Sequence, residues 1–281
     1  MRTGFVKIGT QNLYYAESGP EDARYAILIF NGIGANVETA KTFMKQFENR
    51  RVIIFDVPGV GRSPTPMFPY RFSNMTRLAA GLLDHLGVVD VDVFGVSWGG
   101  GLAQQFAYDY PDRTNRLILA ATTAGFAMVP GSLKVMSKMA TPKRYTDRSY
   151  MAEIAPEIYG GLVRENKELL TEHMDAMSHS SVRGYVYQLM AISGWTSWPW
   201  LPQLKMPTLI MMGSDDPIIP PVNGRILHNR LPNSEIAEIE CGHLFIITLP
   251  TETAILIEAF LLKTEVKSMP SPSNKAAASH A

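Results

Sequence analysis

This 281-residue sequence has one cysteine, no net charge and no long hydrophobic run. A lone cysteine excludes an intrachain disulfide and a metal site built from several cysteines. Nothing beside Cys241 activates a thiol, so we expect a small buried residue. Lysine plus arginine and aspartate plus glutamate each number 26, with no basic stripe, which gives nucleic-acid binding no support. No apolar run approaches the ~18 residues of a membrane span.

The first 19 residues alternate in polarity like a strand and contain no apolar signal region, so we expect a cytoplasmic location. Hydrophobic residues make up 46% of the chain and charged residues 19%, the balance of a globular protein with a sizeable core. A near-zero net charge gives weak colloidal repulsion, which fits a protein that settles on surfaces or self-associates. It specifies no oligomeric state.

What the chain does have is an alternation of strand and helix patterns. Residues 4–18 predict a β-hairpin around the turn residues GTQN. Short runs rich in Val, Ile and Leu follow at 25–30, 51–56, 91–96, 116–121, 207–213 and 234–240. Helical patterns lie at about 36–48, 73–86, 98–110, 219–230 and 245–263. Continuous apolar strands separated by helices predict an α/β fold, with a mostly parallel sheet and helices on both faces.

One segment interrupts this alternation. Residues 125–204 have no strong strand pattern, and they carry helical patterns, many methionines and the run GWTSWPWLPQL. Because a structureless loop of that length is improbable in a compact domain, we expect an inserted helical cap. The core is then expected to comprise residues 1–124 and 205–265. Residues 266–281 are rich in Ser, Pro and Ala, and we expect a disordered tail.

The stretch VFGVSWGGG (93–101) places four glycines around one serine directly after an apolar strand. It contains G-x-S-x-G, the nucleophile elbow that forms at a sharp strand-to-helix turn. Side chains two positions before and after Ser97 would collide in such a turn, which accounts for Gly95 and Gly99. The helix that follows would direct its amide groups and positive dipole end at the serine. The alternative is a glycine-rich turn packed closely against a neighbour.

A serine nucleophile requires a base, and the chain contains six histidines. His243 follows the strand pattern at 234–240 and opens the last helix, and loops at the carboxyl ends of strands carry the catalysts of α/β sheets. His85 and His228 lie in helical patterns, where a surface role is the simpler interpretation. Three more histidines fall in the cap or the tail, namely His173, His179 and His280. We therefore predict His243 as the base.

The third catalytic group should be a carboxylate after the next-to-last strand, where Asp215 and Asp216 precede a proline. The acid directly before the proline is expected to point inward, so Asp216 would orient the imidazole and stabilise its cation. Asp215 is expected to cap the turn. The chain order Ser97, Asp216, His243 is that of the α/β-hydrolases, so we predict the α/β-hydrolase fold.

Two backbone N–H groups should form an oxyanion hole, in which each donor is typically worth ~3 kcal/mol. Trp98 follows the nucleophile and supplies the first. The second should come from NGIGAN (31–36), where lipases and esterases usually have a histidine-glycine pair. Asn31 in place of that histidine changes a side-chain anchor and not the amide. Ile33 is the predicted donor, Gly34 is the alternative, and an ordinary glycine turn is the non-catalytic interpretation.

Ten short motifs extend from about residue 26 to residue 250, through both core and cap. They are FNGIGAN, FDVPGVG, YRF, GVSWGG, LAQQFAYDYP, AGFAMVPG, YGG, GWTS, DDPIIP and GHLFIIT. Many α/β-hydrolases share the single motifs. The combination of NGIGAN, GVSWGG and GWTS is more specific, and it resembles the intracellular depolymerases of medium-chain-length polyhydroxyalkanoates.

The resemblance implies that Ser97, Asp216 and His243 form the catalytic triad. The implied substrate is a polyester of (R)-3-hydroxy fatty acids stored as granules, so we expect association with a hydrophobic granule surface. Ester hydrolysis through an acyl-enzyme requires neither a cofactor nor a metal. Small residues are usual in the family where Arg62 and Pro64 stand, which leaves the preferred side-chain length open.

The cap offers apolar side chains for such an insoluble substrate. The candidates for substrate or granule contact are Phe126, Met128, Trp195, Trp198 and Trp200. Methionine adapts to irregular apolar shapes, and tryptophan suits an interface between oil and water. The alternative for each residue is packing in the core of the cap itself.

Three other functions remain open on the same fold, which hosts many chemistries. One is a carboxylesterase or lipase that uses the same triad on smaller acyl esters. Another is a cofactor-free haloperoxidase-like enzyme or a C–C bond hydrolase. The third is a non-catalytic binding protein of the granule surface, against which an intact triad argues.

Overall fold

The computed structural model describes residues 1–23, 25–141, 143–166, 170 and 181–268. Its strands are β1 (Arg2–Ile8), β2 (Gln11–Ser18), β3 (Ala26–Phe30), β4 (Arg51–Phe55), β5 (Val91–Val96), β6 (Thr114–Ala120), β7 (Thr208–Gly213) and β8 (Ser234–Ile239). They form one sheet in the order β1-β2-β4-β3-β5-β6-β7-β8. The hairpin β1–β2 and the pair β2–β4 are antiparallel, and every other pair of neighbours is parallel. The predicted strands and hairpin are confirmed.

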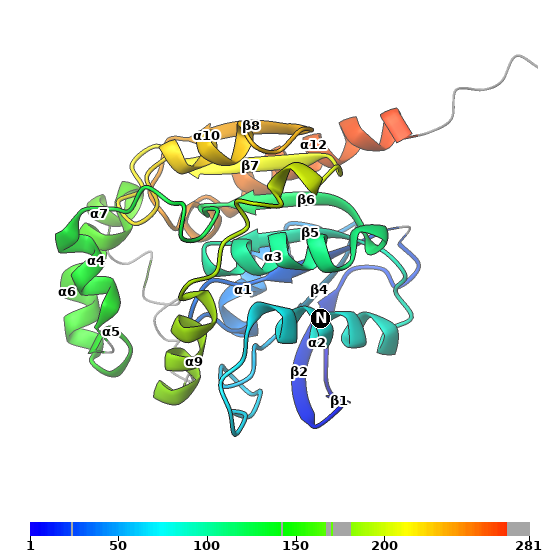
Figure 1. The fold of residues 1–281 in the computed structure, drawn as a ribbon, viewed down its shortest axis with the longest axis horizontal. Helices are drawn as coiled ribbons and strands as arrows, with labels where there is room; N and C mark the ends of the chain where they lie inside the picture. Colours follow the sequence, from blue (N-terminus) through cyan, green and yellow to red (C-terminus); the bar gives the residue numbers. More distant parts are fainter. Residues whose placement is uncertain (24, 142, 167–169, 171–180, 269–281) are drawn as a thin grey trace, which may run out of the picture.

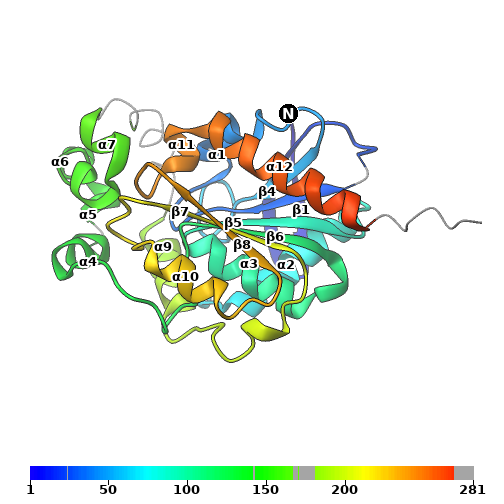
Figure 2. The same cartoon turned by 90° about the horizontal axis from the view of Figure 1, so that it is seen from above.

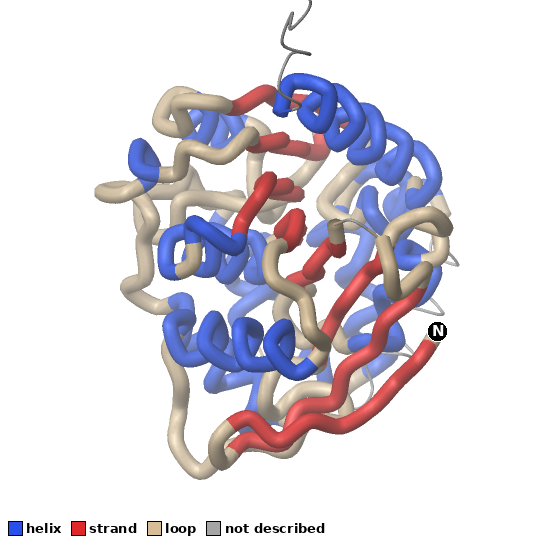
Figure 3. Tube along the Cα trace, turned by 90° about the vertical axis from the view of Figure 1, so that its right-hand side faces the viewer, coloured by secondary structure: helices blue, strands red, loops and turns tan. Residues whose placement is uncertain are grey.

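Helices cover both faces of the sheet, whose twist is visible in Figure 3. Figure 2 shows α2 (Phe72–His85), α3 (Trp98–Asp109) and α10 (Val222–His228) on one side, with α1 (Val37–Met44), α11 (Phe245–Thr248) and α12 (Pro250–Ser268) on the other. Each face has its own apolar cluster. Because of this double cover, β3, β5 and β7 are buried at every position. The predicted α/β architecture is confirmed.

The last helical pattern, predicted as one helix over 245–263, is split in two. Proline has no N–H to donate within a helix and is best tolerated in the first turn, and Pro250 is the first residue of α12. This helix continues to Ser268, past the start of the tail predicted at 266. The rest of that tail, 269–281, lies outside the described residues. Across the described ranges no helix is long and apolar enough to cross a membrane.

Between β6 and β7 the chain forms a helical layer beyond one end of the sheet (Figure 1). Its elements are α4 (Leu133–Ala140), α5 (Lys143–Thr146), α6 (Arg148–Tyr159), α7 (Gly161–Glu165) and α9 (Val182–Ile192). The 3-10 helix η3 (Leu201–Gln203), which directly precedes β7, lies apart from this layer (Figure 1). Among the described residues of 125–204 there is no strand, and the isolated bridge from Gly125 to Thr196 joins the two ends of the segment. We refer to 125–204 as the cap. Its helices bury a separate apolar cluster that includes Ile154, Ile158 and, from the core, Ile218.

Candidate active site

Ser97 occupies a strained turn between β5 and α3. Its φ of 55° and ψ of −120° lie in a region that residues with a side chain rarely adopt. A Cβ added to Gly95 would lie 2.4 Å from the Gly99 carbonyl oxygen. One added to Gly99 would lie 2.1 Å from the carbonyl oxygen of Phe30, in strand β3. Both glycines are therefore required by close backbone approach, as the motif predicts.

The next two glycines also make room for specific neighbours. A Cβ on Gly100 would lie 2.4 Å from the Thr122 side chain, whose hydroxyl donates to the Ser97 carbonyl oxygen at 2.8 Å. A Cβ on Gly101 would lie 2.8 Å from the Phe72 ring and 3.1 Å from that of Trp195. Gly100 thus admits the loop after β6, and Gly101 admits aromatic rings beneath the cap.

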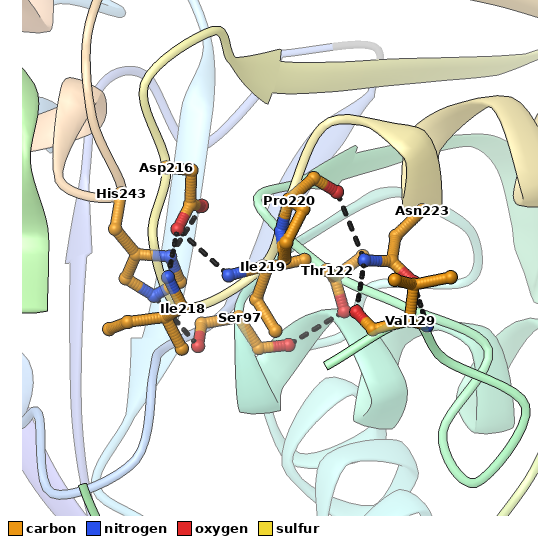
Figure 4. A network of polar contacts seen from close by, with 9 residues as sticks. All are labelled: Ser97, Thr122, Val129, Asp216, Ile218, Ile219, Pro220, Asn223 and His243. Atoms are coloured by element: carbon orange, nitrogen blue, oxygen red, sulfur yellow. Dashed lines mark hydrogen bonds and ion pairs between the residues drawn. The ribbon is translucent and has the colours of Figure 1, made fainter. Parts of the chain in front are cut away.

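The three residues predicted as a triad lie together at the carboxyl ends of β5, β7 and β8 (Figure 4). The distance from His243 Nε2 to Ser97 Oγ is 3.1 Å. The distance from His243 Nδ1 to Asp216 Oδ2 is 2.7 Å. Asp216 and His243 are both buried. This chain of hydrogen bonds can move a proton from the serine hydroxyl to the imidazole while the carboxylate stabilises the resulting cation.

The two adjacent aspartates have different roles in the structure. Asp216 Oδ1 accepts the N–H groups of Ile218 and Ile219, both at 2.9 Å, so the triad carboxylate is also the residue that holds its own turn. Asp215 was predicted to cap that turn, and this is corrected. It accepts the first N–H of α7 and forms an ion pair with Arg164 at 2.7 Å. Asp215 therefore ties the cap to the core.

Tyr159, at the end of α6, holds the histidine loop from the cap side. Its carbonyl oxygen accepts the backbone N–H of His243 at 2.8 Å, and the two rings stack with centroids 6.3 Å apart. A Cβ on Gly242 would lie 2.0 Å from the same carbonyl oxygen. Burial raises the pKa of the Tyr159 phenol, so it stays neutral beside the imidazole. The sequence analysis did not single out Tyr159, although the YGG motif contains it.

The proposed oxyanion donors flank the serine from two elements. The Trp98 N–H is the first amide of α3, and it has no hydrogen-bond acceptor in the part of the chain that the structure describes. The loop after β3 is anchored by Asn31, whose Nδ2 donates to the carbonyl oxygen of Asn36 at 2.8 Å and to Oγ1 of Thr39 at 3.0 Å. Asn31 thus anchors this loop through its side chain.

Within that loop the two candidate donors have different surroundings. The Gly34 N–H donates to Oε1 of Gln188, on α9, at 2.9 Å. Ile33 lines both of the cavities that reach Ser97. The Gly34 N–H is thus engaged by the cap, and Ile33 stays the predicted second donor. Gln188 escaped the sequence analysis because nothing local marks a glutamine that contacts a loop more than 150 residues away.

A largely apolar cavity of about 420 Å³ lies on one side of Ser97, between the core and the cap. Its wall includes Trp98, Met136, Leu189 and Ile218. A smaller cavity of about 50 Å³ also reaches Ser97 and is lined by His243, Tyr159 and Leu244. The serine therefore stands where two spaces of unequal size meet.

The five cap candidates divide into two groups. Phe126, Met128 and Trp195 line the large cavity. Among the described residues, Trp198 and Trp200 do not line that cavity. Trp200 stacks on Tyr108 of α3 at 4.5 Å, and Trp198 lies under the Arg230 guanidinium at 4.6 Å. These two tryptophans pack against the end of α3 and the residues after α10, outside the large cavity.

Other residues considered from sequence lie outside the site. His228 bonds Ser234 through Nδ1 at 3.0 Å, and the His85 ring faces Tyr15. Cys241 is buried. The histidines predicted in the cap and tail, His173, His179 and His280, lie outside the described residues. Over the described ranges no cluster of three or more His, Cys, Asp or Glu could hold a metal ion.

Asp56 has a structural role in the loop after β4. Its carboxylate accepts the N–H groups of Val37 at 2.7 Å and of Arg62 at 2.8 Å. Burial raises the pKa of Asp56 from 3.8 to about 6, against the effect of these two hydrogen bonds. The Arg62 guanidinium lies over the Tyr14 ring at 4.7 Å, away from the cavity walls that the described residues form.

This fold and this arrangement of serine, histidine and aspartate are those of an α/β hydrolase. The model of the alpha/beta hydrolase fold family matches residues 25–153 and 165–250, and the chain belongs to that family. It is 48% identical over 268 residues to the poly(3-hydroxyalkanoate) depolymerase of Ectopseudomonas oleovorans, with 95% of each chain covered. The resemblance found in the motifs is thereby confirmed.

More distant relatives share the fold with other activities. The chain is 26% identical to 3-oxoadipate enol-lactonase 2 of Acinetobacter baylyi, covering 89% of this chain and 92% of the relative. The crystal structure of the enol-lactonase from Burkholderia xenovorans LB400 superposes with a TM-score of 0.81 at 23% identity, covering 92% of this chain and 100% of that one. At that identity the likeness shows the fold alone.

Proposed function

We propose that this protein is a serine hydrolase that cleaves the ester bonds of stored medium-chain-length poly(3-hydroxyalkanoate) and releases (R)-3-hydroxyalkanoic acids or their oligomers. The observation that carries the reaction type is the hydrogen-bond chain from Ser97 through His243 to Asp216, with distances of 3.1 and 2.7 Å. The 48% identity to a poly(3-hydroxyalkanoate) depolymerase supports the choice of substrate.

The reaction proceeds in two halves. His243 takes the Ser97 proton while Oγ attacks the ester carbonyl carbon, and Asp216 stabilises the imidazolium. The oxyanion of the tetrahedral intermediate accepts the N–H groups of Trp98 and Ile33. The C–O bond to the alcohol part then breaks, and His243 returns the proton to the leaving oxygen. Water, deprotonated by His243, hydrolyses the acyl-enzyme and releases the acid.

The two cavities support an arrangement of the scissile ester. The leaving oxygen must reach His243 Nε2 to be protonated, and the small cavity is the one that His243 lines. We therefore expect the leaving oxygen at this cavity, while the polymer chain attached to it, which is much larger than about 50 Å³, extends away from it. The acyl part, with its alkyl side group, lies in the large cavity of about 420 Å³, a volume within the range of small-molecule sites of ~300–1,000 Å³.

The test of this function is hydrolysis of polymer emulsions that differ in side-chain length. Wild type should release acid from medium-chain polyester, and Ser97→Ala should lose at least ~10⁴-fold in rate. A fluorophosphonate probe should label the wild type and not the variant. Faster turnover of small soluble esters than of any emulsion would favour the carboxylesterase or lipase alternative. Absence of labelling would favour a non-catalytic granule protein.

The proposal includes a cytoplasmic protein that binds the granule surface, and a band of exposed apolar residues supports it. Val182, Val186 and Met190 recur every four residues along the outer face of α9, and all three are exposed. Residues at this spacing share one side of a helix. Leu189, on the adjoining side of the same helix, lines the large cavity. The band therefore adjoins the space that holds the acyl chain.

The band continues beyond α9 on both sides. Tyr187 donates its hydroxyl to the carbonyl oxygen of Met67 at 3.0 Å, which brings the loop of Met67 and Phe68 beside the helix; these two side chains are 78% and 73% exposed. Across the cavity, Phe126 lines the wall and is still 83% exposed. Large apolar side chains gathered at one opening are the mark of an interaction site.

Substitution of Met67 and Phe68 by serine tests the granule contact. This variant should bind and hydrolyse polymer emulsions more weakly and leave the turnover of a short soluble ester unchanged. Trp198→Ser is the matched control, because Trp198 is partly exposed but packs under Arg230 away from the band. An equal loss on emulsion and soluble ester, or an equal effect of the control, would contradict the assignment of this surface.

A further inference from the structure

Gln188, on the cap helix α9, contacts the residues on both sides of the proposed oxyanion hole. Its Oε1 accepts the N–H of Gly34 at 2.9 Å, next to Ile33 in the chain. Its backbone carbonyl oxygen accepts the indole Nε1–H of Trp98 at 2.9 Å. The side chain is completely buried. One residue of the cap thus bonds both segments that carry the donors.

The contact with Gly34 restrains the peptide unit next to the one that carries the Ile33 N–H. Gly34 has a φ of +74°, in the left-handed region that favours glycine, so the direction of its N–H is not dictated by ordinary loop geometry. Because peptide units are planar, the bond from Gln188 fixes the plane between Ile33 and Gly34. On the preceding side, the Gly32 N–H donates to Oδ1 of Asn31 at 3.2 Å. The Ile33 amide is therefore held between one restraint from the core and one from the cap.

The second contact restrains the other donor through its side chain. The Trp98 indole is buried, its ring packs edge-on against Phe72 at 4.8 Å, and its single N–H is the one that reaches Gln188. Trp98 is also the first residue of α3. A fixed indole fixes the start of this helix and hence the direction of the Trp98 backbone N–H.

The side-chain amide of Gln188 destabilises the fold at this position. Its Nε2 is buried and has no hydrogen-bond partner in the described structure. A buried donor left unsatisfied destabilises the folded state. An apolar side chain of similar length would avoid that cost and still pack, but it could not accept the Gly34 N–H. Stability alone therefore does not account for a glutamine at this position.

We propose that Gln188 is a positioning residue of the oxyanion hole, which makes the alignment of both N–H donors depend on a seated cap. This inference rests on the proposed function, because it requires hydrolysis at Ser97. It predicts that loss of the acceptor lowers the rate of the chemical step and leaves ground-state binding largely unchanged.

Two substitutions separate positioning from packing. Gln188→Met has similar length and no strong acceptor, whereas Gln188→Glu retains a carbonyl oxygen for the Gly34 N–H. On a soluble p-nitrophenyl alkanoate we expect Gln188→Met to lower kcat at least tenfold, since loss of an oxyanion donor lowers kcat by up to ~10²–10³-fold. We expect KM to change by less than about threefold. Gln188→Glu should recover most of kcat. Tyr187→Phe, which removes a neighbouring bond between cap and core, should keep kcat within about twofold of wild type, far from the ~10²-fold range of a lost donor.

A transition-state analogue supplies the readout that packing would not change. An alkyl boronic acid forms a tetrahedral adduct on Ser97 Oγ and places an oxygen in the oxyanion hole. Its affinity should fall in Gln188→Met by the same factor as kcat. The inference is overturned if Gln188→Met has wild-type kcat, or if kcat falls while boronate affinity stays unchanged. Ser97→Ala tells the two failures apart, because activity in that variant defeats the proposed function itself.

Discussion

Replacement of Asp216 by asparagine should disable the histidine without disturbing the fold. Asp216 Oδ1 accepts two backbone N–H groups, from Ile218 and Ile219. An asparagine must keep its carbonyl oxygen toward these two donors, because its NH₂ group cannot accept hydrogen bonds. The NH₂ group then faces His243 Nδ1, at the place where Oδ2 now lies 2.7 Å away. The orientation of the new side chain is therefore decided by the loop.

That orientation forces the wrong tautomer. With the asparagine donating to Nδ1, His243 must carry its proton on Nε2, which lies 3.1 Å from Ser97 Oγ and can no longer accept the serine proton. In a triad this change costs ~10⁴-fold in kcat, equivalent to roughly 5.5 kcal/mol at ~1.36 kcal/mol per factor of ten. Single-turnover hydrolysis of a soluble ester measures it, with the unfolding temperature as a check on the fold.

The adjacent residue provides the control. Asp215→Asn removes an exposed carboxylate that pairs with Arg164 and makes no contact with His243 in the described structure, so kcat should stay within about threefold of wild type, small beside the ~10⁴-fold loss expected at the triad. A rate for Asp216→Asn within tenfold of wild type would refute the assignment of the triad acid. A loss in Asp215→Asn as large as that in Asp216→Asn would refute the reasoning from orientation.

Two further predictions concern stability. Ser97→Gly relieves the backbone strain at φ 55°, which is worth about 1–3 kcal/mol, less ~0.5–1 kcal/mol for the entropy that glycine loses on folding. This variant should therefore unfold at a higher temperature than Ser97→Ala. The reverse order of unfolding temperatures would show that the backbone at Ser97 is not strained. For Asp56, the folded pKa of about 6 exceeds the ordinary 3.8, so its stabilising contribution is complete below pH ~4 and is lost as pH rises through 6. Between pH 4 and pH 7, urea titrations should show Asp56→Asn gaining roughly 2.4 kcal/mol relative to wild type, at ~1.36 kcal/mol per pKa unit, and a constant difference would rule this out.

The triad could be predicted from sequence because each member is marked by local chemistry. Ser97 is surrounded by the glycines that a strand-to-helix turn demands, and Asp216 and His243 each follow an apolar strand directly. Parallel strands end at one edge of a sheet, so three separate local patterns converge on one site. The fold and the site could be predicted together, because the strand pattern determines which loops lie at the same edge of the sheet.

The contributions of the cap could not be predicted in the same way. Apolar composition does not tell which side chains are exposed: Trp200 stacks against the core, whereas Met67 and Phe68, in an unremarked loop, stand out into solvent. Gln188 and Tyr159 act through contacts with residues far away in the sequence. Periodicity carries no information on how an inserted segment folds back over the core.

The contacts from the cap converge on the catalytic machinery itself. Tyr159 accepts the N–H of the triad histidine, Arg164 pairs with the neighbour of the triad acid, and Gln188 bonds the loop of the second oxyanion donor. A lid that only excluded water would need none of these bonds. Because each bond connects a different loop of the site to the cap, displacement of the cap would loosen the base, the acid and the oxyanion hole together. We therefore propose that hydrolysis requires a seated cap, with the acyl chain enclosed before its ester bond is attacked.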